Sequence, residues 1–275
     1  MDQRSDVPGI LRFCLAGQAD TGLAWLDKTM GDLAAGAPDR ALFTAFAAAP
    51  REVGRDELPV HALPSGPVVW TRDQAARIML LLAWPHDAGF VSALDRLFVA
   101  ADLAELVCLY QALSLLPFPE RHVMRAAEGV RSNMLPVFQA IAVGNPYPSA
   151  WFDEGAWNQM VVKAVFVGCS LHGIVGLDRR ANPALARMLV DYARERRAAG
   201  RAVTPDLWRP VGPFVEGERM LNEVRHALDD PCETRRHEVA AALAANTQSG
   251  PAGDRFTATT GVEAPPAPSH HQSSD

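Results

Sequence analysis

Cysteine is scarce in this sequence, and the few cysteines lie far apart. They form no C-x-x-C pair, the spacing typical of metal sites and redox centres. Scattered thiols in a chain of 275 residues are typical of reduced, buried side chains, because disulfide frameworks occur mainly in small secreted domains. The sequence therefore gives no support for a disulfide-stabilised protein. The cysteines are Cys14, Cys108, Cys169 and Cys232.

The short motifs of the common enzyme classes are missing as well. There is no G-x-S-x-G, no Walker loop, no G-x-G-x-x-G and no H-E-x-x-H. His226, Cys232 and His237 follow a spacing that matches no standard zinc arrangement. Cys169 and His172 lie three residues apart and offer a nucleophile and a base, but a cysteine is more often a small buried hydrophobe. We therefore expect no metal and no cofactor.

Long uncharged hydrophobic runs and an excess of positive charge are absent too. The most apolar stretch, 97–118, carries Asp102 and Glu105 and has a helical stripe, which favours a buried helix over a membrane span. The first residues lack the cationic start and clean apolar run of a signal peptide, so we expect a cytoplasmic protein. A net charge of −6 gives no argument for nucleic-acid binding.

What the sequence does have is helical periodicity in a chain that is 48% hydrophobic. Thr71 and Gln74 have capping-box spacing at the start of one helix, and Pro136 should kink or interrupt another. The best strand candidate, 66–70, is short. The pattern predicts an all-α fold of stacked antiparallel helical hairpins, either HEAT-like or an irregular bundle. Helices are expected over 72–84, 103–113, 123–141, 154–168, 182–200, 216–229 and 233–245.

The expected domain organisation is one helical domain over 1–246 followed by a disordered tail over 247–275. The tail is rich in Pro, Gly, Ser and Thr and has almost nothing to bury. His270 and His271 lie in it and make a weak metal site.

Three polar residues stand in the apolar segment that begins at Trp157. Asn158, Gln159 and Lys163 follow it on a helix that is apolar nearly all round and therefore predicted to be buried on most sides. An unpaired buried ammonium costs several kcal/mol, so Lys163 must reach solvent, meet a carboxylate such as Asp178, or face a polar cavity. Two interpretations stay open: a structural contact of Lys163, or a ligand cavity lined by the three residues.

The turn that follows, "GLDRRAN" at 176–182, adds more polar groups. Asn182 is suited to cap the next helix, with Pro183 in its first position. Arg180 could hold an anion near that helix start or pair with Asp178 across the turn. Asp191 has i,i+4 spacing to Arg187 on the next helix.

Four stretches together resemble the EboA family: "NPYP" from 145, "FDEGAWNQMVVKAVFVG" from 152, "GLDRRANPALARMLVDYARERRAAGR" from 176 and "LWRPVGPF" from 207. The resemblance is most specific over 145–214. It implies a role in traffic of secondary-metabolite precursors, together with other ebo-cluster proteins that include a UbiA-type membrane prenyltransferase. It supplies no catalytic residues. The positions it marks for inspection are Trp157, Asn158, Gln159, Lys163, Asp178, Arg180, Asn182, Asp191 and Arg201.

The sequence leaves three hypotheses. The first is a non-enzymatic binding or scaffold protein that assists metabolite traffic through protein–protein contacts or through a small anionic or polar metabolite. The second is an enzyme acting on a small prenylated or aromatic precursor, with Lys163 or Asp178 as the acid–base group. The third is a helical protein in which these polar residues only fix the packing. A concave site around the polar residues would favour the enzyme over the other two.

Overall fold

The computed structural model describes residues 9, 11, 12, 15, 20–58, 70–87 and 89–245, and within them the regular structure is all-α. The predicted strand at 66–70 falls mostly outside the described residues; at its end, Thr71 forms an isolated antiparallel bridge with Glu57. The predicted tail at 247–275 also lies outside. The α-helices are α2 Asp20–Ala34, α3 Asp39–Val53, α4 Arg72–Ala83, α5 Phe90–Ala100, α6 Leu103–Ala112, α7 Val123–Arg131, α8 Leu135–Ala142, α9 Tyr147–Trp151, α10 Glu154–Phe166, α11 Pro183–Ala198, α12 Gly217–Leu228 and α13 Glu233–Ala245.

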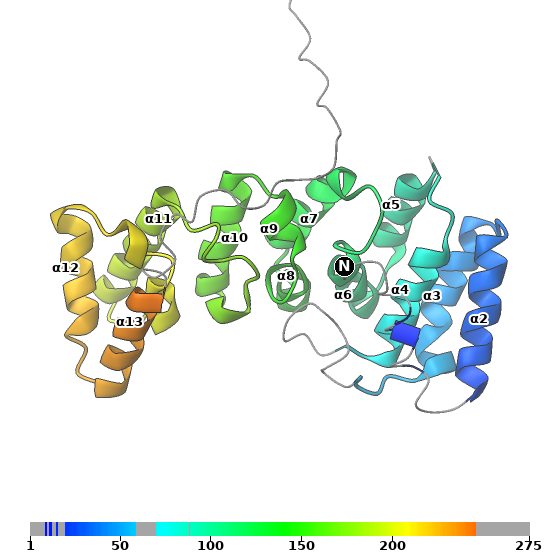
Figure 1. The fold of residues 1–275 in the computed structure, drawn as a ribbon, viewed down its shortest axis with the longest axis horizontal. Helices are drawn as coiled ribbons and strands as arrows, with labels where there is room; N and C mark the ends of the chain where they lie inside the picture. Colours follow the sequence, from blue (N-terminus) through cyan, green and yellow to red (C-terminus); the bar gives the residue numbers. More distant parts are fainter. Residues whose placement is uncertain are drawn as a thin grey trace, which may run out of the picture.

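The helices stand in an elongated row, from α2 at one end to α12 and α13 at the other (Figure 1). Helices α2, α3 and α4 pack together, α6 and α7 pack on α8, α10 packs on α11, and α11, α12 and α13 follow in sequence. Regular antiparallel hairpins remain a prediction. Short 3-10 helices in the described part of the chain join the row: η2 Pro119–His122, η3 Leu171–Gly173, η4 Pro205–Trp208 and η5 Gly212–Phe214.

Several predicted helix ends are confirmed with their physical causes. The Thr71 N–H donates to Gln74 Oε1 at 3.0 Å, which closes one half of the capping box at the start of α4. Pro136 lies in the first turn of α8, so the periodic stretch 123–141 is two helices rather than one. Gly200 takes a φ of +66° just after α11, as expected for a glycine that ends a helix.

The described residues form one apolar core that runs through the row, with Phe46, Phe138 and Trp157 among its largest fully buried side chains. The helices also differ in how much of their own apolar surface is buried. The last helical residue of α10, Phe166, has 74% of its surface exposed, so the prediction that α10 is buried on most sides is wrong at that end. Within the described part of the chain, no helix has the length and hydrophobicity needed to cross a bilayer.

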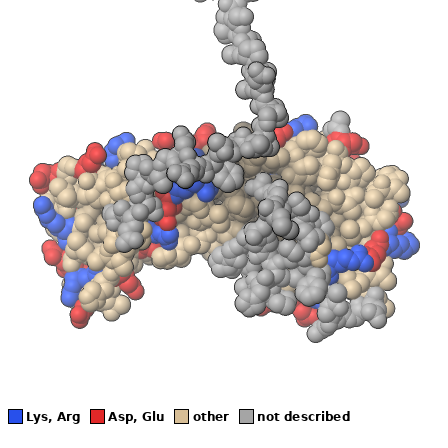
Figure 2. Space-filling model, in the orientation of Figure 1, with Lys and Arg blue, Asp and Glu red and all other residues tan. Residues whose placement is uncertain are grey.

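Charged side chains of both signs lie at both ends of the row on the face that Figure 2 shows. Among the residues drawn in colour on that face, neither sign forms a broad continuous area. A protein that neutralises several phosphates of a nucleic acid needs such an area of Lys and Arg. The coloured part of this face shows none.

One buried histidine gives the fold a pH dependence. The His122 side chain lies inside the protein, and its Nε2 donates to the Pro117 carbonyl at 2.8 Å. Burial lowers the pKa of His122, opposed by the Pro117 hydrogen bond and by the charges of Asp95 and Glu120, while Arg121 adds to the lowering. The folded protein therefore resists protonation of this ring more than the unfolded chain does.

We expect stability to fall as the pH drops below about 6.5, the ordinary value for histidine, towards the lower pKa of folded His122. In that window the unfolded chain binds a proton that the folded chain does not. Thermal melting at pH values between about 7.5 and 5.5 measures the effect. His122→Gln keeps a donor for the Pro117 carbonyl but cannot titrate, so its melting temperature should fall less than that of the wild type. Equal slopes would contradict the assignment.

Candidate functional site

Asn158 and Asn182 form a reciprocal pair that joins α10 to the start of α11. Asn158 Nδ2 donates to Asn182 Oδ1 at 3.2 Å, and Asn182 Nδ2 donates to Asn158 Oδ1 at 2.9 Å. The same Asn182 Oδ1 accepts the Leu185 N–H at 2.8 Å, which confirms Asn182 as the N-cap of α11. Asn158 is buried, and this pair supplies its partner. The pair therefore connects α10 to the start of α11 through both side chains.

Arg180 lies against Trp157 and the end of α9. Its Cζ is 4.9 Å from the centre of the Trp157 ring, whose side chain is fully buried. Its Nη1 lies within hydrogen-bond distance of three carbonyl oxygens, of which Phe152 O is the nearest at 2.7 Å. Burial, with the neighbouring charge of Arg179, lowers the pKa of Arg180. The predicted ion pair between Arg180 and Asp178 is therefore wrong.

A glycine allows this close approach of the turn to α9. Gly176 has a φ of +80°, and a Cβ there would stand 2.1 Å from Ser149 Oγ. Arg179 donates to the same Ser149 Oγ at 2.7 Å. The turn that begins at Gly176 therefore packs closely against α9. The glycine conformation allows this approach, and hydrogen bonds from Arg179 and Arg180 hold it.

Lys163 points to the end of a different helix. Its Nζ donates to the carbonyl oxygens of Val130 at 2.5 Å and Ser132 at 2.8 Å, at the C-terminal end of α7. It also lies 5.0 Å from the centre of the Phe138 ring. A cation here satisfies carbonyls that have no partner within α7. Desolvation lowers the pKa of Lys163. The predicted ion pair between Lys163 and Asp178 is wrong.

Lys163→Met should lower the free energy of unfolding by about 1–3 kcal/mol, because the Val130 and Ser132 carbonyls lose their charged donor. Urea unfolding of the wild type and the variant measures the change. Lys28→Met is the matched control, since Lys28 is 81% exposed in an i,i+4 pair with Asp32 and should change little. Equal midpoints for the two variants would show that the α7 contact is not structural.

Asp178 binds an arginine that the sequence did not single out. Arg209 donates from Nε to Asp178 Oδ1 at 2.8 Å and from Nη2 to Oδ2, while its Nη1 lies 3.2 Å from His172 Nδ1. A guanidinium only donates, so His172 Nδ1 is the acceptor of this contact. Asp178, Arg209 and His172 therefore form one chain of contacts at the turn after α10.

The remaining predicted residues lie apart from this chain. Gln159 is exposed. Asp191 pairs with Arg219 of α12, so its predicted pairing with Arg187 is wrong. The predicted residues thus separate into the Asn158–Asn182 pair, the Arg180–Trp157 contact, the Lys163 contact and two ion pairs. Lys163 and Asp178, the two acid–base candidates, contact different partners.

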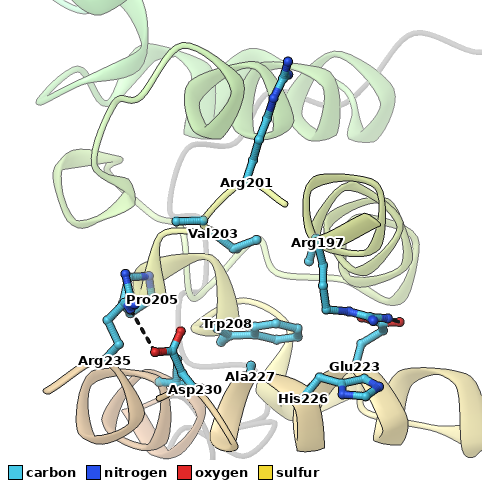
Figure 3. A pocket seen from close by; sticks show the side chains of 13 residues that line it. Arg197, Arg201, Val203, Pro205, Trp208, Glu223, His226, Ala227, Asp230 and Arg235 are labelled. Atoms are coloured by element: carbon cyan, nitrogen blue, oxygen red, sulfur yellow. Dashed lines mark hydrogen bonds and ion pairs between the residues drawn. The ribbon is translucent and has the colours of Figure 1, made fainter. Parts of the chain in front are cut away.

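Arg201 borders a small hollow between α11, α12 and α13 (Figure 3). The hollow measures about 130 Å³, and Trp208 of η4 lies in its wall. Arg197 pairs with Glu223 and Arg235 pairs with Asp230, so the charges beside Trp208 are already matched. Figure 3 shows the Arg201 side chain extending away from the other residues. We call this feature the arginine hollow; its size and paired charges suit packing between helices better than an organic ligand.

A larger groove lies on the other side of η4, between η3, η4 and α13. It measures about 580 Å³, within the range of small-molecule sites. We call it the η4 groove. Trp208 of η4 faces the arginine hollow, whereas Asp206 and Arg209 border the groove. The residues of the groove are Gly168, Cys169, Ser170, His172, Thr204, Pro205, Asp206, Arg209, Glu238, Ala241, Ala242 and Ala245.

Asp206 orders one wall of the η4 groove. Its Oδ2 accepts hydrogen bonds from the Leu171 N–H at 2.7 Å and from Ser170 Oγ at 3.1 Å. Its Oδ1 is shielded from solvent and has no hydrogen-bond partner in the described structure. A buried oxygen without a donor costs about 1–3 kcal/mol, so such an atom commonly marks a place for water or ligand.

Sequence reasoning missed Asp206 and Glu238 because no motif surrounds them. Their elements come together only when α13 packs on η4. The Cys169–His172 pair behaves differently from a nucleophile and its base: Gln139 Nε2 donates to Cys169 Sγ at 3.7 Å, and His172 Nδ1 contacts Arg209. In the described part of the chain, no three His, Cys, Asp or Glu side chains group as metal ligands would.

Comparison with known proteins places the chain in a family. The model of a family described as "Metabolite traffic protein EboA" matches residues 8–212. No curated protein and no solved structure matches the chain. The match includes the turn after α10 and η4, and it ends before α12 and α13. One wall of the η4 groove therefore lies within the family match and the other outside it.

Proposed function

The chain belongs to the EboA family, and from this premise we propose that it assists metabolite traffic as a non-enzymatic helical binding or scaffold protein. We further propose that it works in the cytoplasm, in secondary metabolism, beside other ebo-cluster proteins such as a UbiA-type membrane prenyltransferase. Its cargo would be a small anionic or polar precursor. The family match supports the traffic role, and the resemblance seen in the sequence supports the partners.

The main observation in favour of a non-enzymatic role is that the ionisable groups around α10 are already bonded to other groups of the protein. Lys163 donates to two backbone carbonyls, Arg180 to three, and Asp178 holds Arg209 with both oxygens. A general acid or base needs a face free to meet substrate. These groups instead make contacts between helices. This supports a binding or scaffold protein over the acid–base enzyme.

Deletion of the gene in its host separates the two functions. Loss of a traffic protein should leave the precursor chemically unchanged but retained in the cytoplasm, whereas loss of an enzyme should accumulate a different, unprocessed molecule. Mass spectrometry of cytoplasmic and exported fractions distinguishes these outcomes. Retention of the finished precursor supports the proposal, and accumulation of an unprocessed molecule overturns it.

Two conservative variants sharpen that test. Lys163→Arg keeps donors for both carbonyls but stays protonated at neutral pH, and Asp178→Asn keeps an acceptor for Arg209 but carries no charge. Both should restore export in the deletion strain if the proposal holds. Failure of either variant, with the protein folded and present at wild-type level, would favour the enzyme with Lys163 or Asp178 as its acid–base group.

The partner is tested separately by co-purification. The tagged protein should be recovered with membranes that contain the UbiA-type prenyltransferase and lost from membranes that lack it. Recovery that does not depend on the prenyltransferase would remove it as a partner.

A further inference from the structure

Helices α12 and α13 are attached to the rest of the row through little apolar surface. The buried residues of α12 are Met220 and Glu223, and those of α13 are Val239 and Ala242, whereas most of α4 is buried. The free energy that holds an element in place depends largely on the apolar area that it buries. Helices α12 and α13 are therefore held more weakly than α4, and such elements open before the protein unfolds as a whole.

The contact of α13 with the rest of the protein is close but is made by small groups. A Cβ added at Gly212 would stand 2.5 Å from the carbonyl oxygen of Leu243, so the backbone of α13 directly approaches the start of η5. Helix α13 also packs on η4. There Trp208 is only 3% exposed and shares the arginine hollow with Ala227 of α12 and Val239 of α13. Trp208 thus lies where both helices meet η4.

Two ion pairs in the described structure connect α12 to α11. Glu223 accepts from Arg197 Nη2 at 2.6 Å and from Arg197 Nε at 3.1 Å, and Arg219 pairs with Asp191. The side chains of Arg197, Arg219 and Asp191 are 48%, 58% and 48% exposed. Ion pairs with this much contact with solvent are screened by salt and stabilise weakly. They orient α12 on α11 but add little to the strength of the attachment.

Helices α12 and α13 are joined to each other and follow a glycine. Asp230, in the turn between them, accepts from Arg235 Nε at 3.1 Å through Oδ1 and from Arg236 Nη1 at 2.7 Å through its carbonyl oxygen. The two helices also pack on each other. Gly217, the first residue of α12, has a φ of +73°, and a Cβ there would meet nothing within 4 Å. A glycine with free space around it allows the backbone rotation that a hinge requires.

We propose that α12 and α13 form a hinged cap, turning at Gly217, that opens as one unit and uncovers Trp208 and the apolar surface of η4 around it. The two helices stand at the end of the row (Figure 1), so the cap opens away from the other helices. Residues of η4 lie within the family match, whereas the cap lies beyond it. The cap therefore controls access to a surface of the matched part of the chain, and this goes beyond the traffic role proposed above.

Hydrogen exchange of the full chain, followed by mass spectrometry of its peptides, tests the opening. Amides of α12 and α13 should have equal protection factors, on the order of 100-fold lower than those of α4 and α8. Added salt should lower the protection of α12 and α13 by about twofold to fivefold and leave α4 unchanged. Protection of α12 and α13 equal to that of α4, or clearly different between the two helices, would overturn the proposal.

A pair of variants on α13 tests whether the two helices open together. Ala242→Glu places a carboxylate where α13 is buried and should lower the protection of both α12 and α13 by at least about tenfold, with α4 unchanged. Ala240→Glu makes the same change at an exposed position of α13 and should have little effect. Loss of protection in α13 alone, or equal effects of the two variants, would overturn the proposal.

Acrylamide quenching of tryptophan fluorescence tests which surface the cap covers. Ala242→Glu should increase the quenching relative to Ala240→Glu, because Trp208 becomes accessible when the cap opens. Adding Trp208→Phe to Ala242→Glu should remove this increase. No increase, or an increase that persists without Trp208, would overturn the assignment of η4 as the covered surface. The gene-deletion test of the traffic role does not depend on any of these results.

Discussion

Arg77→Ala is expected to lower the free energy of unfolding by about 3–5 kcal/mol, because it leaves buried carboxylates without their cation. Arg77 and Asp73 have side chains only 3% and 7% exposed, and Arg77 Nη1 donates to Asp73 Oδ2 at 2.6 Å. Glu105 of α6 lies 3.9 Å from the same guanidinium. The change removes the guanidinium that contacts both carboxylates.

Arg77 also joins three helices. Its Nε donates to the Phe46 carbonyl of α3 at 3.0 Å, and its Cζ lies 5.3 Å from the Phe46 ring. From α4 it therefore contacts α3 and α6 together, and no smaller residue reaches both. Burial beside this network raises the pKa of Cys108 to about 12, so the thiol stays protonated.

Urea unfolding followed by circular dichroism measures the loss, with the slope checked for a change in two-state behaviour. Arg77→Lys should recover only part of the stability, since an ammonium lacks the planar fork that serves Asp73 and Phe46 together. Arg96→Ala is the exposed control and should change little, because Arg96 pairs with Asp39 at the surface. A loss below about 1 kcal/mol for Arg77→Ala would contradict the assignment of Arg77 as the cation that stabilises these buried carboxylates.

Arg180→Ala should lower the free energy of unfolding by about 2–4 kcal/mol. The change leaves the Ser149 and Phe152 carbonyls without the Arg180 donor, leaves the Pro148 carbonyl with the Phe152 N–H alone, and removes the cation from the face of Trp157. Ser149 and Phe152 lie at the C-terminal end of α9, where carbonyls lack partners within the helix. The loss should therefore loosen the turn after α10 as well as α9.

Two neighbouring arginines provide controls for Arg180. Arg179→Ala removes one hydrogen bond, to Ser149 Oγ, and should cost less. Arg187 is exposed and has no hydrogen bond or ion pair in the described structure, so Arg187→Ala should be close to wild type. Equal losses for all three variants would mean that Arg180 has no special role in packing.

Much of the fold followed from local pattern. Periodic apolar positions predicted the helices from α4 onward, except α5 and α9, and gave no ranges for α2 and α3. The ends at Thr71, Asn182 and Gly200 were correct because capping depends on a few neighbouring residues. Pro136 was expected to kink or interrupt a helix and in fact separates α7 from α8. The all-helical class and the family resemblance also came from the sequence alone.

The partners of the charged residues could not be predicted from the local sequence pattern. Lys163, Arg180 and Asp191 each meet a group far away in sequence, and the residues near them in sequence misled the prediction. Long side chains reach several ångströms in any direction that packing leaves open, so spacing along one helix says little about contacts between helices. The predicted cluster around α10 was therefore divided among several helix junctions.

The sequence by itself determined that this protein is a helical member of the EboA family, since helix formation, capping and the family motifs are local properties of the chain. Only the tertiary structure decided that Lys163 and Arg180 donate to backbone carbonyls at the ends of other helices. It also decided that Asp206 and Glu238 border one groove. The physical reason is that Asp206 and Glu238 are brought together by the packing of α13 on η4, and packing between elements is encoded only in the whole set of buried contacts.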